Sequence, residues 1–205
     1  MKKRRFLSSF SVFDIIVIAM CAGLGIAVKP VIAPLAHIIT GPFLIPGGTV
    51  AGGFYMLFIV LAAALISKPG ASTLTCFVQS LLVIITGVIG NHGIMSLVTY
   101  LIPGLMADFF YMLLKNKAEP LRCFFMGLIA NAAGIFLTNA VFFNLPVQWL
   151  ALALLAGAVS GGIGGLGAWA LARGSRKIFP VFRTQESKDG ARISDENKQA
   201  GTDIE

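Results

Sequence analysis

Few side chains in the apolar part of this sequence could take part in chemistry. The long apolar segments contain two acids, Asp14 and Asp108, and the chain has two histidines, His37 and His92. Catalysis within a membrane needs ionisable groups at depth. The sequence contains no paired carboxylates in those segments, no HExxH motif and no phosphate-binding glycine loop. We therefore expect no enzyme activity and no directly bound cofactor, and we expect any use of ATP to occur in partner subunits.

The other polar residues are better suited to holding a ligand than to reacting with it. Several lie at the ends of apolar segments, on the side of the membrane that the charge distribution below predicts to be outside. A small-molecule site needs convergent donors and acceptors above an apolar base. The candidate substrate-binding residues are Lys29, His37, Asn91, His92, Tyr100, Asn139 and Trp149, accompanied by Thr40, Thr99, Thr138, Asn144 and Gln148.

Two alternative interpretations apply to these residues. Asn, Gln, Tyr and Trp also anchor helix ends at the interface between membrane and water. The two histidines could bind a metal ion or a haem iron. Since neither has a third ligand at helical spacing, we predict exposed loop histidines and no metal site.

The elements that would position these residues are long apolar helices. The chain of 205 residues is 57% hydrophobic and 12% charged, whereas a soluble domain carries about 25% charged residues. Runs of about 20 apolar residues are long enough to cross a bilayer as helices, and they do not alternate as barrel strands would. The runs cover residues 10–28, 48–67, 71–90, 94–114, 123–143 and 147–172.

The positive charges predict how the chain crosses the membrane. The segment 31–46 is apolar but short and rich in proline. If it stays outside, Lys68 and the basic cluster after residue 172 face the cytoplasm, as the positive-inside rule favours. We therefore predict an all-α membrane protein, a six-transmembrane-helix bundle with an outer loop or re-entrant segment after the first helix.

The predicted organisation follows from this topology. Residues 1–9 form a basic cytoplasmic N-terminus, and residues 10–172 form the membrane domain with an extracellular loop at 30–47. Residues 173–205 form a polar cytoplasmic tail, expected to be disordered because it is polar and mixed in charge. Since the net charge of +7 comes largely from the span ends and the tail, nucleic acid is not an expected partner. The protein is expected in a bacterial cell membrane, with both termini cytoplasmic.

The acids and cysteines within the apolar segments also allow predictions. Asp14 lies in the first turn of the first helix, where a carboxylate stabilises the positive helix end. Asp108 lies inside a span and is predicted either to couple or gate transport or to make a structural hydrogen bond. The cysteines Cys21, Cys76 and Cys123 have no metal-binding spacing and are expected to be buried packing residues.

Small residues recur on two of the predicted helices. Ala19, Gly23 and Ala27 lie four apart on the first helix, and glycines crowd the last helix between residues 161 and 167. Small residues at such spacing let two helices approach closely in a membrane. We expect the first set to dock onto another membrane subunit and the second to pack inside the bundle.

Two stretches of the sequence resemble a known family. They are residues 52–71, which end in Ser-Lys-Pro-Gly-Ala, and Pro-Gly-Leu-Met-Ala-Asp at 103–108. Both are similar to the substrate-binding S component of energy-coupling factor (ECF) transporters, and the resemblance covers roughly residues 10–172. The nearest branch is the YkoE-like family, which is linked to thiamine or its hydroxymethylpyrimidine precursor.

The resemblance implies a function and partners. An S component captures a vitamin or related micronutrient from outside, in a pocket formed by the loop after helix one and helices four to six. It docks on an EcfT-type membrane coupling subunit through small residues of helix one, here Ala19, Gly23 and Ala27. Two cytoplasmic EcfA-type ATPases would then drive uptake.

The chain departs from the family at positions that bear on the substrate. It has Pro103 in place of a glutamine, Asp108 in place of a glutamate, and Cys76 and Val83 where the family looks acidic. The resemblance therefore extends to fold and transporter class more than to substrate. The alternatives are an importer subunit for a metal ion or a tetrapyrrole (haem or cobalt), a non-transport assembly subunit, and a small membrane enzyme acting on lipids.

Overall fold

The computed structural model describes residues 10–41, 47–88 and 92–179, and these residues are almost entirely helical. The predictions for residues 1–9, for Asn91 and for the tail beyond residue 179 lie outside the described residues. The helices are α1 (Val12–Ala27), α2 (Lys29–Thr40), α3 (Gly47–Ile66), α4 (Ala71–Thr86), α5 (Ser96–Leu113), α6 (Glu119–Thr138) and α7 (Val147–Ile178), with a π-helical turn, η3 (Asn139–Phe143), between α6 and α7.

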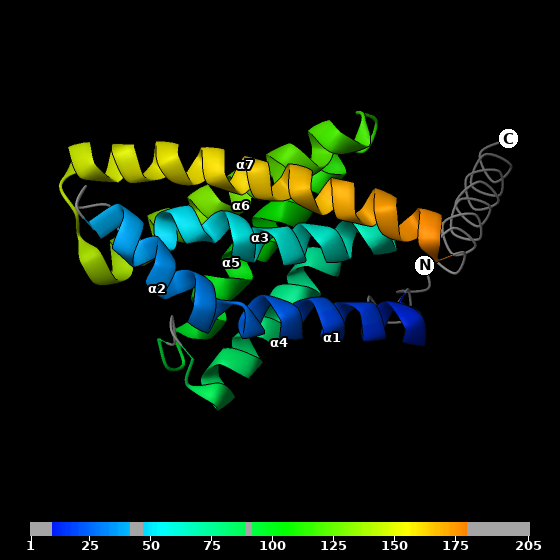
Figure 1. Ribbon diagram of the computed structural model, residues 1–205, viewed down its shortest axis with the longest axis horizontal. Helices are drawn as coiled ribbons and strands as arrows, with labels where there is room; N and C mark the ends of the chain where they lie inside the picture. The colour runs from blue at the N-terminus through cyan, green and yellow to red at the C-terminus, as the bar shows by residue number, and fades with distance from the viewer. Residues whose placement is uncertain (1–9, 42–46, 89–91, 180–205) are drawn as a thin grey trace, which may run out of the picture.

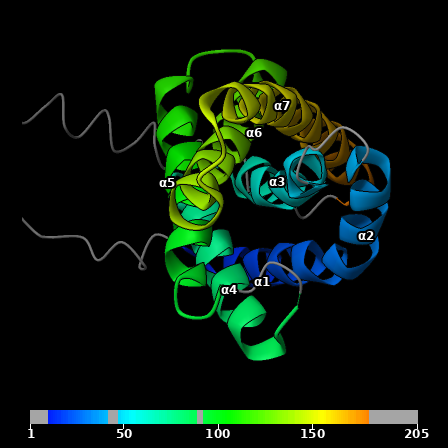
Figure 2. The ribbon, with the colours of Figure 1, turned by 90° about the vertical axis from the view of Figure 1, so that its left-hand side faces the viewer.

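Helix α3 is the centre of the bundle. It packs against α1, α2, α4, α6 and α7, and Figure 2 shows it surrounded by the other helices. In the apolar 18-residue stretch of α3, 56% of the residues are buried inside the bundle, compared with 28–33% in the corresponding stretches of α5, α6 and α7. Small residues permit this position, because Gly53 brings its backbone against Gly164 of α7.

The segment predicted as an outer loop or re-entrant segment is largely helical, and its bent arrangement with α1 fits either one broken span or a re-entrant segment. Residues 29–40 form α2, which follows α1 after a bend of 42° and is visible at the left of Figure 1. The bend falls where Pro30 supplies no backbone N–H and therefore cannot continue the hydrogen bonding of α1. Pro30 lies in the first turn of α2, where proline is tolerated, whereas Pro34 lies inside the helix.

The structure has fewer helices that are long enough to cross a membrane than the six crossings predicted from the sequence. Each of the six predicted runs falls on a helix, but only α3, α5, α6 and α7 are long and apolar enough to cross alone. The bent pair α1 and α2 would make a fifth crossing, whereas α4 is apolar but shorter. Helix α7 continues to Ile178, beyond the predicted end of the membrane domain at residue 172.

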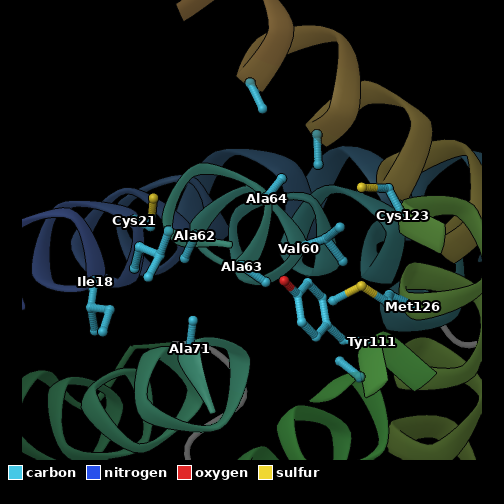
Figure 3. Close-up of a cluster of buried hydrophobic side chains, with 14 of the residues drawn as sticks. Ile18, Cys21, Val60, Ala62, Ala63, Ala64, Ala71, Tyr111, Cys123 and Met126 are labelled. Atoms are coloured by element: carbon cyan, nitrogen blue, oxygen red, sulfur yellow. The ribbon is translucent and has the colours of Figure 1, made fainter. Parts of the chain in front are cut away.

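The core is built from small and sulfur-containing residues around α3. Ala62, Ala63 and Ala64 of α3 belong to one buried cluster with Cys21 of α1 and Tyr111 of α5, part of which is drawn in Figure 3. All three cysteines are buried and free, which confirms their predicted packing role. The alanines allow close helix packing, since each occupies little more than the backbone itself.

The acids of the apolar segments have structural partners at the end of the bundle where α1 begins and α7 ends. Asp14 completes a capping box with Ser11 and also pairs with Lys68 at 2.8 Å, so its predicted role at the helix start is confirmed. Asp108 accepts hydrogen bonds from the backbone N–H of Ser72 and Thr73, at 3.3 and 2.8 Å. It therefore caps α4, because the residue at the N-cap position, Gly70, has no side chain to do so.

Candidate functional site

A cavity of about 380 Å³ lies at the opposite end of the bundle, where α2, α3, α5, α6 and η3 converge. This volume is within the range of ligand-binding pockets. Its base is apolar, formed by Met56, Ile59, Pro103 and Ile135. The polar or aromatic residues that line it are Lys29, His37, Thr49, Tyr55, Gln79, His92, Thr99, Tyr100, Asn131, Thr138, Asn139 and Phe143.

Among the described residues, Lys29 is the one buried cation of this wall, and it is only 6% exposed. The bend between α1 and α2 places it there. Its ammonium group donates a hydrogen bond to the hydroxyl of Tyr100 and lies over the rings of Tyr100 and Tyr55, at 4.2 and 5.0 Å from their centroids. No Asp or Glu lines the cavity in the part of the chain that the structure describes. The positive charge therefore has aromatic rings and a phenol as partners but no carboxylate.

Gln79 of α4 is a second buried polar residue in the wall, with an exposed fraction of 2%. Its side-chain nitrogen has no hydrogen-bond partner among the described residues. The amide fits there because the facing residue of α1 is Gly25, where any side chain would collide with it. A buried donor without an acceptor is costly, and a bound ligand is one source of the missing acceptor.

The two histidines both border the cavity but differ in their surroundings. The His92 ring stacks on Phe142, with 4.3 Å between ring centroids. Burial, and to a smaller extent the nearby charge of Lys29, lower the pKa of His92 below its usual value, so the ring is neutral at neutral pH. His37 is exposed on α2 and packs on the first residue of α3, Gly47.

Two asparagines in the wall hold the helices together. The Asn131 side chain donates to the carbonyl oxygens of Thr49, at 3.2 Å, and of Gly157, at 2.7 Å, and so joins α6 to α3 and α7. The Asn139 side chain accepts a hydrogen bond from the backbone N–H of Leu145 at 2.9 Å, which closes the turn between η3 and α7. These contacts leave Lys29, Gln79, His92 and Tyr100 as the groups best placed to meet a ligand.

The structure brings together most of the residues predicted from the sequence. Lys29, His37, His92, Tyr100 and Asn139 all line the cavity, as do Thr99 and Thr138. Trp149 does not line it and is 38% exposed near the start of α7, as expected for an interface anchor.

Sequence reasoning did not select four of the polar lining residues, Thr49, Tyr55, Gln79 and Asn131. Gln79 and Asn131 could have been found, because each is an isolated amide side chain inside a charge-free run. Such residues in a span usually face the interior of the bundle.

The predicted docking residues of α1 lie away from the cavity and on the outside. Ala19 and Ala27 are exposed, and a side chain added at Gly23 would meet nothing within 4 Å. Their neighbours Ile16, Met20 and Leu24 are also at least half exposed. By contrast, Gly161 and Gly165 of α7 lie against the backbone of α6, so the prediction that this second set packs internally is confirmed.

Comparison with known proteins supports a transport function. A solved structure described as an S-component of an ECF transporter has the same fold, with a TM-score of 0.70 and 20% identity over 94% of this chain and 98% of that one. No curated protein matches the chain. Residues 13–136 match the family described as "ABC-type cobalt transport system, permease component". With several helices long enough to span a bilayer, the chain is a multi-pass membrane protein that belongs to this permease family.

Proposed function

We propose that this protein is the substrate-capture subunit of an ATP-driven importer of the energy-coupling factor type. The observation that carries the proposal is the 380 Å³ cavity with a polar wall and an apolar base, in a chain with the fold of an ECF S-component. The cavity would bind a vitamin or related micronutrient. Partner subunits would supply ATP hydrolysis.

Ligand binding can be tested with the purified protein. Mass spectrometry identifies any co-purified ligand, and titrations with thiamine, its pyrimidine precursor, haem and cobalt follow. Gly134→Phe should abolish binding, since Gly134 lines the cavity and a side chain there meets only Pro103, at 3.4 Å. The matched control is Gly174→Phe. Gly174 lies in the last turns of α7, and a side chain added there would meet nothing within 4 Å. Equal binding by wild type and Gly134→Phe would place the ligand elsewhere.

A metal ion is the second candidate substrate, because the family description names cobalt and His37 and His92 both line the cavity. The described residues contain no group of three His, Cys, Asp or Glu side chains that could hold a metal ion. Lys29 in the same wall would also repel a cation. Saturable cobalt binding that is lost in His37→Ala and His92→Ala would favour this candidate over an organic nutrient.

The proposed orientation places the cavity outside and the end of α5 in the cytoplasm, with both termini cytoplasmic. Val147 beside the cavity end is 82% exposed, and Lys115 after α5 is also exposed. The natural cysteines are buried, so single cysteines at these positions can be labelled selectively. A membrane-impermeant maleimide should label Val147→Cys in intact cells and Lys115→Cys only after lysis. The reverse pattern would invert the topology.

The proposed partners are an EcfT-type coupling subunit and two EcfA-type ATPases, with α1 docking through Ala19, Gly23 and Ala27. Gly23→Leu should prevent co-purification with the coupling subunit but leave ligand binding intact, because the added side chain points into open space. Gly41→Leu, also without neighbours within 4 Å, serves as the control at the outer end. Loss of binding together with assembly would assign Gly23 to internal packing.

A further inference from the structure

We infer that the ligand of this cavity is a small organic acid, with a carboxylate that meets Lys29 and a flat apolar body. The inference rests on the proposed function, in that it takes the cavity as the binding site. The inference goes further than the proposed function because it specifies a negative charge on the substrate. It therefore excludes both a cationic thiamine-type ring and a divalent metal ion.

The first argument is the charge balance of the cavity. Lys29 is nearly fully buried, and in the described part of the chain it has no ion pair and no acid beside it in the wall. Aromatic rings and a phenol hydroxyl stabilise a cation, but burying a charge without a counter-charge is costly. A carboxylate from the ligand would supply the missing negative charge, and the short lysine–carboxylate hydrogen bond is among the stronger polar contacts in proteins.

The second argument is the number of donors without acceptors. The buried side-chain nitrogen of Gln79 has no partner among the described residues. The preferred angles of the terminal torsion of a glutamine side chain are broad, so a ligand oxygen at this wall could serve as the acceptor for the amide. With the ammonium group of Lys29, the wall then offers two donors to one acceptor group, as a carboxylate with two oxygens requires.

The third argument is the shape of the remaining wall. Tyr55, Tyr100 and Phe143 provide aromatic surface, and Met56 and Ile59 provide the apolar base. Aromatic side chains favour flat, apolar partners that can stack on them. A cationic ring in the same place would lie near Lys29 with no acid to neutralise either charge, and two like charges in an apolar site repel strongly.

Matched pairs of an acid and its neutral counterpart test the inference in the purified full-length protein. We would use nicotinate and nicotinamide, biotin and biotinamide, and pantothenate and panthenol, with thiamine as the cation, and measure binding by calorimetry and thermal shift. We expect the acid of at least one pair to bind at least about tenfold more tightly than its neutral partner, as a hydrogen bond to a charged group would give.

The Lys29 variants identify the group responsible. Lys29→Met should remove the preference for the acid and leave the affinity for the neutral partner within about twofold, whereas Lys29→Arg should keep the preference. Lys115→Met, which removes an exposed lysine at the other end of α5, should behave as the wild type. The melting temperature without ligand shows whether each variant is folded.

The outcomes separate this inference from the proposed function. If no acid in the panel is preferred, or if thiamine binds best and Lys29→Met binds it more tightly, the inference is wrong while a capture function stands. If an acid is preferred through Lys29 but the protein never assembles with a coupling subunit, the inference stands and the proposed function fails.

Discussion

The two ends of the bundle differ in whether their buried charged side chains have partners of opposite charge. At the paired end, defined by Asp14, Lys68, Glu119 and Arg176, two acids have basic partners: Lys68 lies 2.8 Å from Asp14, and Arg176 lies 2.9 Å from Glu119. At the cavity end, Lys29 is more deeply buried than either of these bases and lines a cavity to which no described residue contributes an acid. The difference indicates that charge at the paired end stabilises the fold, whereas charge at the cavity end is available to a ligand.

The paired end also joins elements that are distant in the sequence. Lys68, in the turn between α3 and α4, connects that turn to the start of α1, and Arg176 of α7 donates to the carbonyl oxygen of Ala64 in α3. Arg122 lies 4.8 Å from the ring centroid of Tyr111, between α6 and α5. This end is therefore a set of fixed contacts, and substitutions at the two ends should change stability with opposite signs.

The largest effect is expected for Asp108→Ala. The change leaves the first backbone N–H groups of α4 and the hydroxyl of Thr73 without their acceptor. Loss of a helix cap together with buried unsatisfied donors should destabilise the protein by about 2–4 kcal/mol, measured as the unfolding midpoint in detergent. Asp108→Asn keeps one acceptor oxygen and should therefore lose less stability than Asp108→Ala. An unchanged midpoint for Asp108→Ala would mean that water replaces the cap.

The next effect is expected for Asp14→Ala. Asp14 is fully buried, caps α1 and pairs with Lys68, so its loss should cost about 1–2 kcal/mol of stability. Lys68→Met should cost less, because the lysine is partly exposed. A double-mutant cycle over both positions gives their coupling, and a coupling of zero would show that the capping box alone matters.

A smaller effect with the opposite sign is expected for Lys29→Met. Removing a buried charge that has no carboxylate partner should stabilise the ligand-free protein by about 1 kcal/mol. The same unfolding measurement, made after exhaustive removal of ligand, checks this expectation. Lys29→Arg retains the charge and should not stabilise. Destabilisation by Lys29→Met would mean that Lys29 contributes to the fold in the same way as the lysine of the paired end.

The smallest effect concerns pH and His92. Burial, followed by the charge of Lys29, lowers the pKa of His92, so the unfolded chain binds a proton there more readily than the folded chain. Stability from this residue is therefore present above the ordinary histidine pKa and decreases as the pH falls below it. The melting temperature between pH 7.5 and 5.5 should fall less in His92→Asn than in wild type. His37 is present in both proteins, so any contribution from it cancels. An equal change of melting temperature with pH in the two proteins would contradict a role for His92 in the pH dependence.

Part of the fold and of the site could be read from the chain. The apolar runs correspond to helices, the spacing of Ser11 and Asp14 corresponds to a capping box, and five of the seven candidate binding residues line one cavity. These features depend on neighbours within about one helical turn or on hydropathy, which are local properties of the sequence.

Other features could not be predicted in this way. The helix at residues 29–40 was expected to be an outer loop or re-entrant segment, because the distribution of positive charges favoured leaving this segment outside. Gln79 and Asn131 were not selected from the sequence, and only the packing of the helices shows that both line the cavity. The role of Asp108 was left between gating and structure, since its partners in α4 lie 35 and 36 residues away in the sequence.

The sequence by itself determined that this chain is a helical membrane protein, where six of its helices lie approximately, and which helix faces carry small residues, because hydropathy and short-range spacing specify these properties. Only the tertiary structure decided that Lys29 would be buried between Tyr55 and Tyr100 with no acid nearby. The reason is that contacts between helices depend on which backbones can approach closely, and at Gly53, Gly127 and Gly161 that approach is set by several helices at once.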